Sequence, residues 1–200
     1  MTQDDGWQTQ SADLQERTLD ELLLQLGGQS DREDVKTASI GYRSMPAGLR
    51  GICDILALEY KVSYALFVRT AVAHGAAILA RDPALQNMTE SLRRTRRQAM
   101  KTGDLEALSK MVNKHPFTFM HGQPEKSSVS VDEWTKGLLH DLRDKCGVDL
   151  YVIAGIALMK SLLTLPKGNG YRKMLREEVN HFERAMRDRL AGLTRTLEGE

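Results

Sequence analysis

The sequence predicts a mainly helical protein with short β-strands, built from two copies of a strand–helix–helix unit with additional helices around them. Apolar residues recur with helical spacing over residues 49–60, and a second, largely apolar segment follows at 64–79. Two short segments, 36–44 and 126–131, have the composition of strands. A shift of 86 positions, from Gly51 to Gly137, places the first helical pair on a second one.

The first helical pair is bounded by residues with clear local preferences. Pro46 fits a first helical turn, where its missing N–H costs nothing. A tight turn is predicted at Lys61, and Ser63 is suited to cap the second helix, which Pro83 ends. The apolar face of the first helix follows the spacing i, i+3, i+4, i+7 and i+11 and consists of Leu49, Ile52, Cys53, Leu56 and Tyr60.

With the strand KTASIGYRS before it, this segment resembles the ribbon-helix-helix family of DNA-binding proteins, which includes the Arc-like and methionine-repressor-like proteins. The interval from Pro46 to Ser63 and the segment VSYALFVRTAVAHG carry the resemblance, which covers about a quarter of the chain. The resemblance implies a two-stranded ribbon that enters the DNA major groove. The alternative is an ordinary helical hairpin in an α-helical domain.

A second copy of the unit follows at residues 126–167. In its strand, Val129 and Val131 face one way, whereas Lys126, Ser128 and Ser130 face the other. Asp149 takes the cap position that Ser63 holds in the first copy, and Pro166 is expected to end the last helix. The shift also matches Leu56 with Leu142, Val62 with Val148, Ala71 with Ala157 and Leu79 with Leu165.

A lone short strand leaves its backbone N–H and C=O groups unpaired. Ribbon-helix-helix proteins pair two strands from two chains. This chain could supply both strands itself, as an intrachain pseudo-dimer, or two chains could pair like with like in a homo-oligomer.

Composition and charge narrow the class of protein. The chain has 41% hydrophobic residues, a mean hydropathy of -0.40 and a net charge of +1. Residues 1–35 are acidic, so the remainder is basic, as a DNA-binding surface requires. The start of the chain does not read as a signal peptide, and the run 150–165 is too short for a membrane span. We expect a cytoplasmic, nucleoid-associated protein with no membrane partner, whose Cys53 and Cys146 are free thiols.

The sequence also predicts the structure of the segments outside the two units. Residues 11–26 should form a helix, with Ser11 as a cap, that either packs on its own domain or serves as an acidic arm for a protein partner or for autoinhibition. Residues 87–113 should form a helix that is broken or bent near Gly103, and 115–125 a loop whose Phe117, Phe119 and Met120 dock on the core. Residues 171–197 have a narrow apolar stripe for chain association or for packing across the pseudo-dimer. The predicted divisions are 1–35, 36–84, 85–125, 126–167 and 168–200.

Base-reading side chains should lie on the outward face of the ribbon. Family spacing selects Ile40, Tyr42 and Ser44 for that face in the first strand, whereas polarity selects Ser39 and Arg43. Helix N-termini at Ser63 and Asp149 should meet the flanking phosphates, with Ser63 the stronger clamp. The residues expected to contact DNA are Lys36, Ser39, Tyr42, Arg43, Ser44, Ser63, Tyr64, Lys126, Ser128 and Ser130, and the additional phosphate-contacting arginines Arg93, Arg94, Arg96 and Arg97.

These patterns predict a sequence-specific double-stranded DNA-binding protein, a transcriptional regulator that acts as a repressor. A plasmid partition protein or an architectural DNA-binding protein would use the same ribbon, and a helical assembly protein is the alternative of another class. No phosphate loop or nucleophile with a placed base emerges, so we expect no enzyme and no cofactor. His115 and His121 lack the further ligands that a metal site needs.

Overall fold

The computed structural model describes residues 16–27, 37–42, 45–104, 109, 115–123, 127–166 and 169–198. The described chain is mainly helical, with small two-stranded antiparallel pairings. Its strands are β1 (Thr37–Tyr42), β2 (Met45–Pro46), β3 (Gly122–Gln123) and β4 (Ser127–Asp132). Its helices are α2 (Leu19–Leu26), α3 (Leu49–Tyr60), α4 (Tyr64–Arg81), α5 (Pro83–Thr102), α7 (Glu133–Cys146), α8 (Leu150–Leu162) and α9 (Asn169–Glu198).

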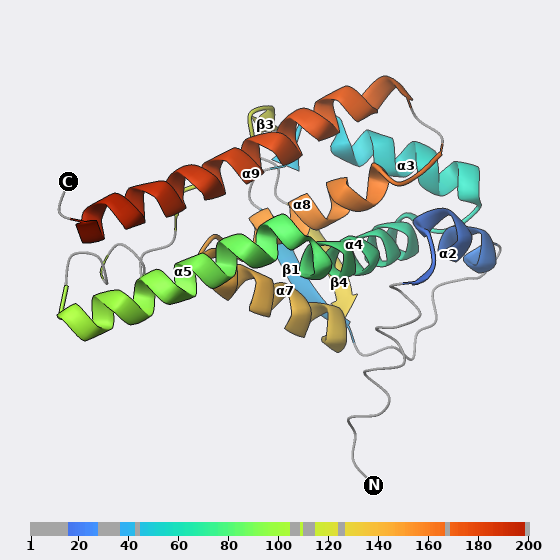
Figure 1. The fold of residues 1–200 in the computed structure, drawn as a ribbon. Helices are drawn as coiled ribbons and strands as arrows, with labels where there is room; N and C mark the ends of the chain where they lie inside the picture. The colour runs from blue at the N-terminus through green and yellow to red at the C-terminus, as the bar shows by residue number, and fades with distance from the viewer. Residues whose placement is uncertain are drawn as a thin grey trace, which may run out of the picture.

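Helices α4 and α8 pack closely on each other at the centre of the molecule (Figure 1). Both helices are apolar on most sides, which is typical of helices buried in a core. At the crossing, a Cβ atom added to Gly75 would lie 1.8 Å from the carbonyl oxygen of Ala157. Only glycine therefore allows the two backbones to approach this closely.

Strands β1 and β4 pair antiparallel to form a short ribbon within one chain. Thr37 lies opposite Asp132, Ser39 opposite Ser130, and Tyr42 opposite Ser127. Of the two arrangements that the sequence allowed, intrachain pairing is therefore the one present. The ribbon packs on the central helices, since β4 contacts α4 and β1 contacts α8.

The connection between the first strand and α3 differs from the sequence prediction. Pro46 lies in β2, which pairs with β3, and α3 begins only at Leu49, after Gly48 with a φ of 83°. The placement of Pro46 in the first helical turn was wrong. The backbone N–H of Ala47 donates to the His121 carbonyl, 2.9 Å away, so a partner distant in sequence holds this segment out of the helix.

Helix α2 packs on its own domain rather than projecting as an arm. Leu19 and Leu23 are fully buried, and Tyr60 donates a hydrogen bond to Asp20. The helix begins after Thr18, which forms a capping box with Glu21. Ser11 lies outside the described residues.

Helices α5 and α9 run side by side and extend beyond the central pair (Figure 1). α5 begins at Pro83, earlier than predicted, because Asp82 accepts hydrogen bonds from the N–H groups of Ala84 and Leu85. It ends at Gly103, which has a φ of 70°. In the second unit the last helix stops at Leu162, before Pro166.

The apolar stripe of α9 is buried against α5 and α8 of the same chain. The stripe therefore packs within one chain, on the helix of the predicted connecting segment and on the last helix of the second predicted unit. The stripe residues that are buried are Leu175, Val179, Phe182 and Met186.

The loop before β3 is held to α9 by a buried carboxylate. Glu178 is fully buried and accepts hydrogen bonds from the backbone N–H groups of Met120 and His121 at 2.9 and 2.7 Å, and it contacts His121 Nδ1 at 2.9 Å. Phe117 and Phe119 dock on the core as predicted. The prediction for Met120 was wrong, because its side chain is exposed while its N–H binds Glu178.

Within the described residues, no single helix has both the length and the apolar composition of a membrane span. Taken together, α3 and α4 meet that test, but they are bent by 104° at the turn between them.

Candidate nucleic-acid interface

The ribbon has one buried and one exposed face. Ile40, Val129 and Val131 are buried against the helical core, whereas Ser39, Ser128 and Ser130 are exposed. Side chains alternate between the faces of a strand, so three hydroxyl groups lie on the outward surface of a narrow two-stranded element. Hydroxyl groups can donate to or accept from base edges.

The structure decides the register of the first strand. Family spacing placed Ile40 on the outward face, and that prediction was wrong because the Ile40 side chain is only 3% exposed. The selection by polarity was correct for Ser39, which is exposed and lies opposite Ser130. Burial of the Ile40 side chain is favourable, and it turns the neighbouring hydroxyl outward.

Of the predicted contact residues next to Ser39, Ser128 and Ser130 in sequence, the structure describes Tyr42. Tyr42 belongs to β1, and its backbone lies opposite Ser127. The predicted residues that flank the two strands in sequence lie outside the described residues: Lys36, Arg43, Ser44 and Lys126.

The N-terminus of α4 has the cap that the sequence predicted. The Ser63 hydroxyl accepts a hydrogen bond from the Leu66 N–H, 3.2 Å away. Arg50 of α3 lies over the Tyr64 ring, with 5.8 Å from its guanidinium carbon to the ring centre. An exposed cation therefore lies beside a helix N-terminus, and both features favour an anion.

Arg69 links α4 to the ribbon and was missed by the sequence analysis. Its Nε donates to the backbone carbonyl of Ser130 over 3.3 Å. The residue lies one to two turns after the Ser63 cap, so α4 brings one arginine into contact with the ribbon. A signal was present in the sequence, because Arg69 is the first charged residue in an otherwise apolar helical segment.

The equivalent positions of the second predicted unit have different chemistry. Asp149 is the N-cap of α8, but its side chain makes no capping hydrogen bond. The same 86-residue shift places Lys136 at the position of Arg50, and Lys136 pairs with Glu133 at 3.5 Å. It places Gly155 at the position of Arg69. The two predicted units are therefore chemically unequal at these positions.

The four arginines of α5 are all exposed, as their spacing around the helix requires. Arg93 and Arg94 lie 3.9 and 3.5 Å from Glu90, in exposed pairs of the kind that contribute little to stability. Arg93 and Arg96 also line a cleft between α5, the C-terminus of α7 and α9. These residues are separate from the ribbon, so they form a second basic surface.

Arg189 stabilises the end of α7 within the same cleft. Its guanidinium donates to the carbonyl oxygens of Cys146 and Gly147 at 2.6 and 2.7 Å, which satisfies backbone acceptors left free at a helix C-terminus. Burial lowers the pKa of this guanidinium, an effect that the nearby Cys146 partly opposes. Arg189 is thus structural in this position.

Among the described residues, His, Cys, Asp and Glu side chains form no group of three that could hold a metal ion. The two cysteines are buried free thiols, and burial raises the pKa of each to about 12.

No protein-family model matches the chain, and no match was found among curated proteins or solved structures.

Proposed function

We propose that the protein binds double-stranded DNA through the β1–β4 ribbon, as two tandem ribbon-helix-helix units in one chain. The observation that carries the proposal is the antiparallel pairing of β1 with β4, which leaves Ser39, Ser128 and Ser130 exposed on one face. A two-stranded ribbon of this kind fits the major groove of B-DNA. Sequence-specific binding at a promoter would make the protein a transcriptional repressor.

The two sides of the ribbon support a binding mode with unequal halves. In the first unit, Arg69 contacts the ribbon, and Ser63 and Arg50 lie at the N-terminus of the same helix, α4, whereas the second unit has Asp149 and a Lys136 that is paired with Glu133. A phosphate is attracted to the first set and repelled by the Asp149 carboxylate. The first unit is therefore the stronger phosphate clamp, and the DNA site has two different halves.

The test is a fluorescence anisotropy titration of the full chain with DNA from its own upstream region and with a scrambled duplex, at two salt concentrations. We expect preferential binding to the upstream DNA and weaker binding at the higher salt, because phosphate contacts release counterions. Equal binding to both duplexes would leave an architectural or partition role. Absence of binding at both salt concentrations would overturn the proposal.

Arg69→Gln tests the clamp directly. Loss of one phosphate-contacting cation should weaken binding to both duplexes and reduce the salt dependence by about one counterion. Arg184→Gln is the matched control, since this exposed arginine lies on α9, which packs on α5 and α8 rather than on the ribbon. Equal affinities of the two variants would argue against a clamp at Arg69.

Asp149→Ser should tighten binding if the second half of the ribbon also meets DNA. The substitution removes a negative charge at the N-terminus of α8 and supplies a hydroxyl like that of Ser63. Unchanged or weaker affinity would restrict the contact to the first unit.

A protein-interaction role has one observation in its favour. Ile55 and Leu58, on the outer face of α3, are 61% and 78% exposed, which is unusual for large apolar side chains that lie one helical turn apart. If DNA binding is absent, sedimentation of the wild type and of Leu58→Lys would test self-association through this face.

A further inference from the structure

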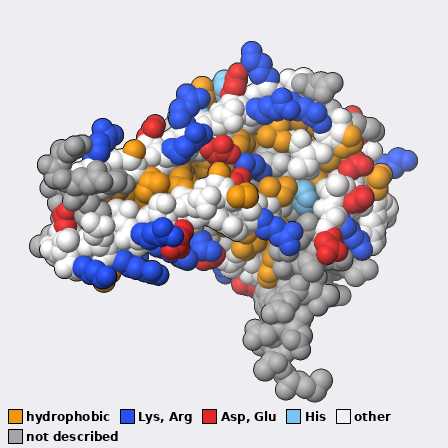
Figure 2. Space-filling view, viewed as in Figure 1, with side chains coloured by type: hydrophobic (Ala, Val, Ile, Leu, Met, Phe, Trp, Pro, Cys, Tyr) orange, Lys and Arg blue, Asp and Glu red, His pale blue; other side chains and the backbone are white. Residues whose placement is uncertain are grey.

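A cavity with a largely apolar lining lies between the end of α4, the start of α5, α8 and α9, and the proposed DNA interface does not account for it. Its volume is about 250 Å³. Leu79, Leu85, Met88 and Phe182 line it, and all four side chains are buried. Figure 2 shows apolar side chains gathered between α5 and α9, with basic and acidic groups around them.

The polar part of the lining is an ion-paired cluster. Lys160 Nζ lies 2.9 Å from Asp82 Oδ2 and 2.8 Å from Glu183 Oε1. Burial disfavours ionisation of Lys160, but the hydrogen bonds and charges of Glu183 and Asp82 outweigh this effect and raise its pKa. Burial likewise opposes ionisation of Asp82, yet Lys160 and two backbone N–H groups hold the pKa of Asp82 below its ordinary value. Lys160 and Asp82 therefore stay ionised at neutral pH.

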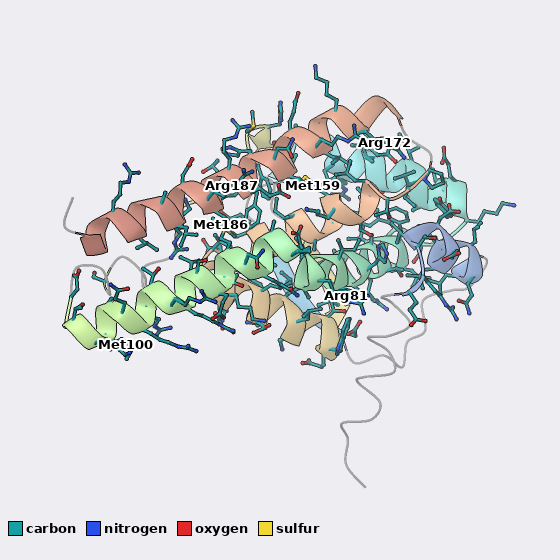
Figure 3. The ribbon with its side chains drawn as sticks, in the orientation of Figure 1. Arg81, Met100, Met159, Arg172, Met186 and Arg187 are labelled. Carbon is teal, nitrogen blue, oxygen red and sulfur yellow. The ribbon has the colours of Figure 1, made fainter. Side chains whose placement is uncertain are left out.

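Arg187 completes the charged groups that line the cavity. It lies midway along α9, next to Met186 (Figure 3). Two cationic side chains, Lys160 and Arg187, balance the two carboxylates of Asp82 and Glu183, so the lining has no net formal charge. Neither an anion nor a cation would gain from the overall charge of this site.

We propose that this cavity binds a neutral, mainly apolar small molecule. Ligand sites typically combine apolar walls with a few fixed polar groups, which here are the members of the Lys160 cluster. The cavity is larger than the roughly 150 Å³ that holds benzene in an engineered core and close to the roughly 300 Å³ of the smallest drug-sized sites. A fused two-ring aromatic compound or a short alkyl chain with one hydroxyl group matches that range. This inference does not depend on DNA binding.

The experiment uses the full chain and N-phenyl-1-naphthylamine, a neutral probe whose fluorescence rises in apolar surroundings. We expect saturable binding of one probe per chain. Ala84→Trp should weaken that binding by about tenfold or more, because the exposed Ala84 lies at the cavity and an indole there would occupy it. Ala191→Trp is the matched control on an exposed position of α9 that does not line the cavity, and it should bind like the wild type.

Displacement of the bound probe by neutral and charged compounds tests the preference of the cavity for a neutral ligand. Naphthalene-1-methanol should displace it at a lower concentration than 1-naphthoic acid or 1-naphthylmethylamine. Circular dichroism and thermal unfolding of each variant establish that it is folded. No saturable binding to the wild type, or unchanged binding to folded Ala84→Trp, would overturn the site. Equal displacement by the charged compounds would overturn its preference for a neutral ligand.

Discussion

At the scale of single residues, the close approach of α4 and α8 depends on the missing side chain of Gly75. An added Cβ atom there would meet the backbone of Ala157, which cannot move aside as the end of a flexible side chain could. The backbones of α4 and α8 can therefore approach this closely only because Gly75 has a hydrogen atom where other residues have a Cβ atom.

Gly75→Ala should destabilise the protein by about 1 to 3 kcal/mol or more, as overpacking of a core does. Urea unfolding measures the effect. Gly51→Ala is the control, because Gly51 lies in the exposed face of α3 with no atom within 4 Å of an added Cβ. That substitution should stabilise by roughly 0.4 to 1 kcal/mol. Similar stabilities of the two variants would contradict the close approach.

The buried His74 should make the free energy of unfolding depend on pH. Its Nδ1 lies 2.8 Å from the Ser161 hydroxyl, and burial lowers its pKa, although a hydrogen bond with the Arg17 backbone partly opposes this. The unfolded chain therefore binds a proton more readily than the folded chain below about pH 6.5. This contribution to stability is complete above that pH and is lost as the pH falls toward the folded-state pKa.

We expect the free energy of unfolding to decrease between pH 7.5 and pH 5, and to decrease less in His74→Gln. Burial, and to a smaller extent the charge of Arg189, lowers the pKa of His115. This residue therefore also makes the free energy of unfolding decrease at low pH, and His115→Gln serves as the comparison. An identical pH dependence in wild type and His74→Gln would contradict the assignment to His74.

At the scale of elements, Glu178 connects α9 to the loop that leads into β3. A fully buried carboxylate that accepts two backbone N–H groups is satisfied only while the loop keeps this conformation. Because β3 pairs with β2, the contact also fixes the segment that precedes α3.

Glu178→Gln should cost roughly 1.5 to 3 kcal/mol, the value of hydrogen bonds to a charged group. Thermal unfolding measures it, with Glu177→Gln as the control on the neighbouring, partly exposed position. Hydrogen exchange at Met120 and His121 should accelerate in the first variant only. Unchanged exchange there would show that the carboxylate does not hold the loop.

At the scale of the whole molecule, a single chain supplies both strands of the ribbon and both central helices. One continuous hydrophobic core includes residues from both predicted units as well as α2, α9 and the loop before β3. The segments 36–84 and 126–167 therefore cannot be expected to fold independently, although they are separate in sequence.

The unfolding midpoint of the protein should not depend on its concentration, because no second chain is required to complete the ribbon or the core. Unfolding should also be one cooperative transition by circular dichroism and by fluorescence. A midpoint that rises with protein concentration would show that association contributes to folding.

The sequence by itself determined the helical pairs, the cap at Ser63 and the inward face of β4, because these follow from periodicity and local hydrogen bonding. Tertiary structure alone decided that β1 pairs with β4 of the same chain, that Ile40 faces inward and that Pro46 belongs to a strand. It also brought Arg69 to the edge of the ribbon and enclosed the cavity beside Lys160. Local patterns specify which face of a helix or strand is apolar. Which other helix or strand covers that face depends on packing between residues that are distant in the chain.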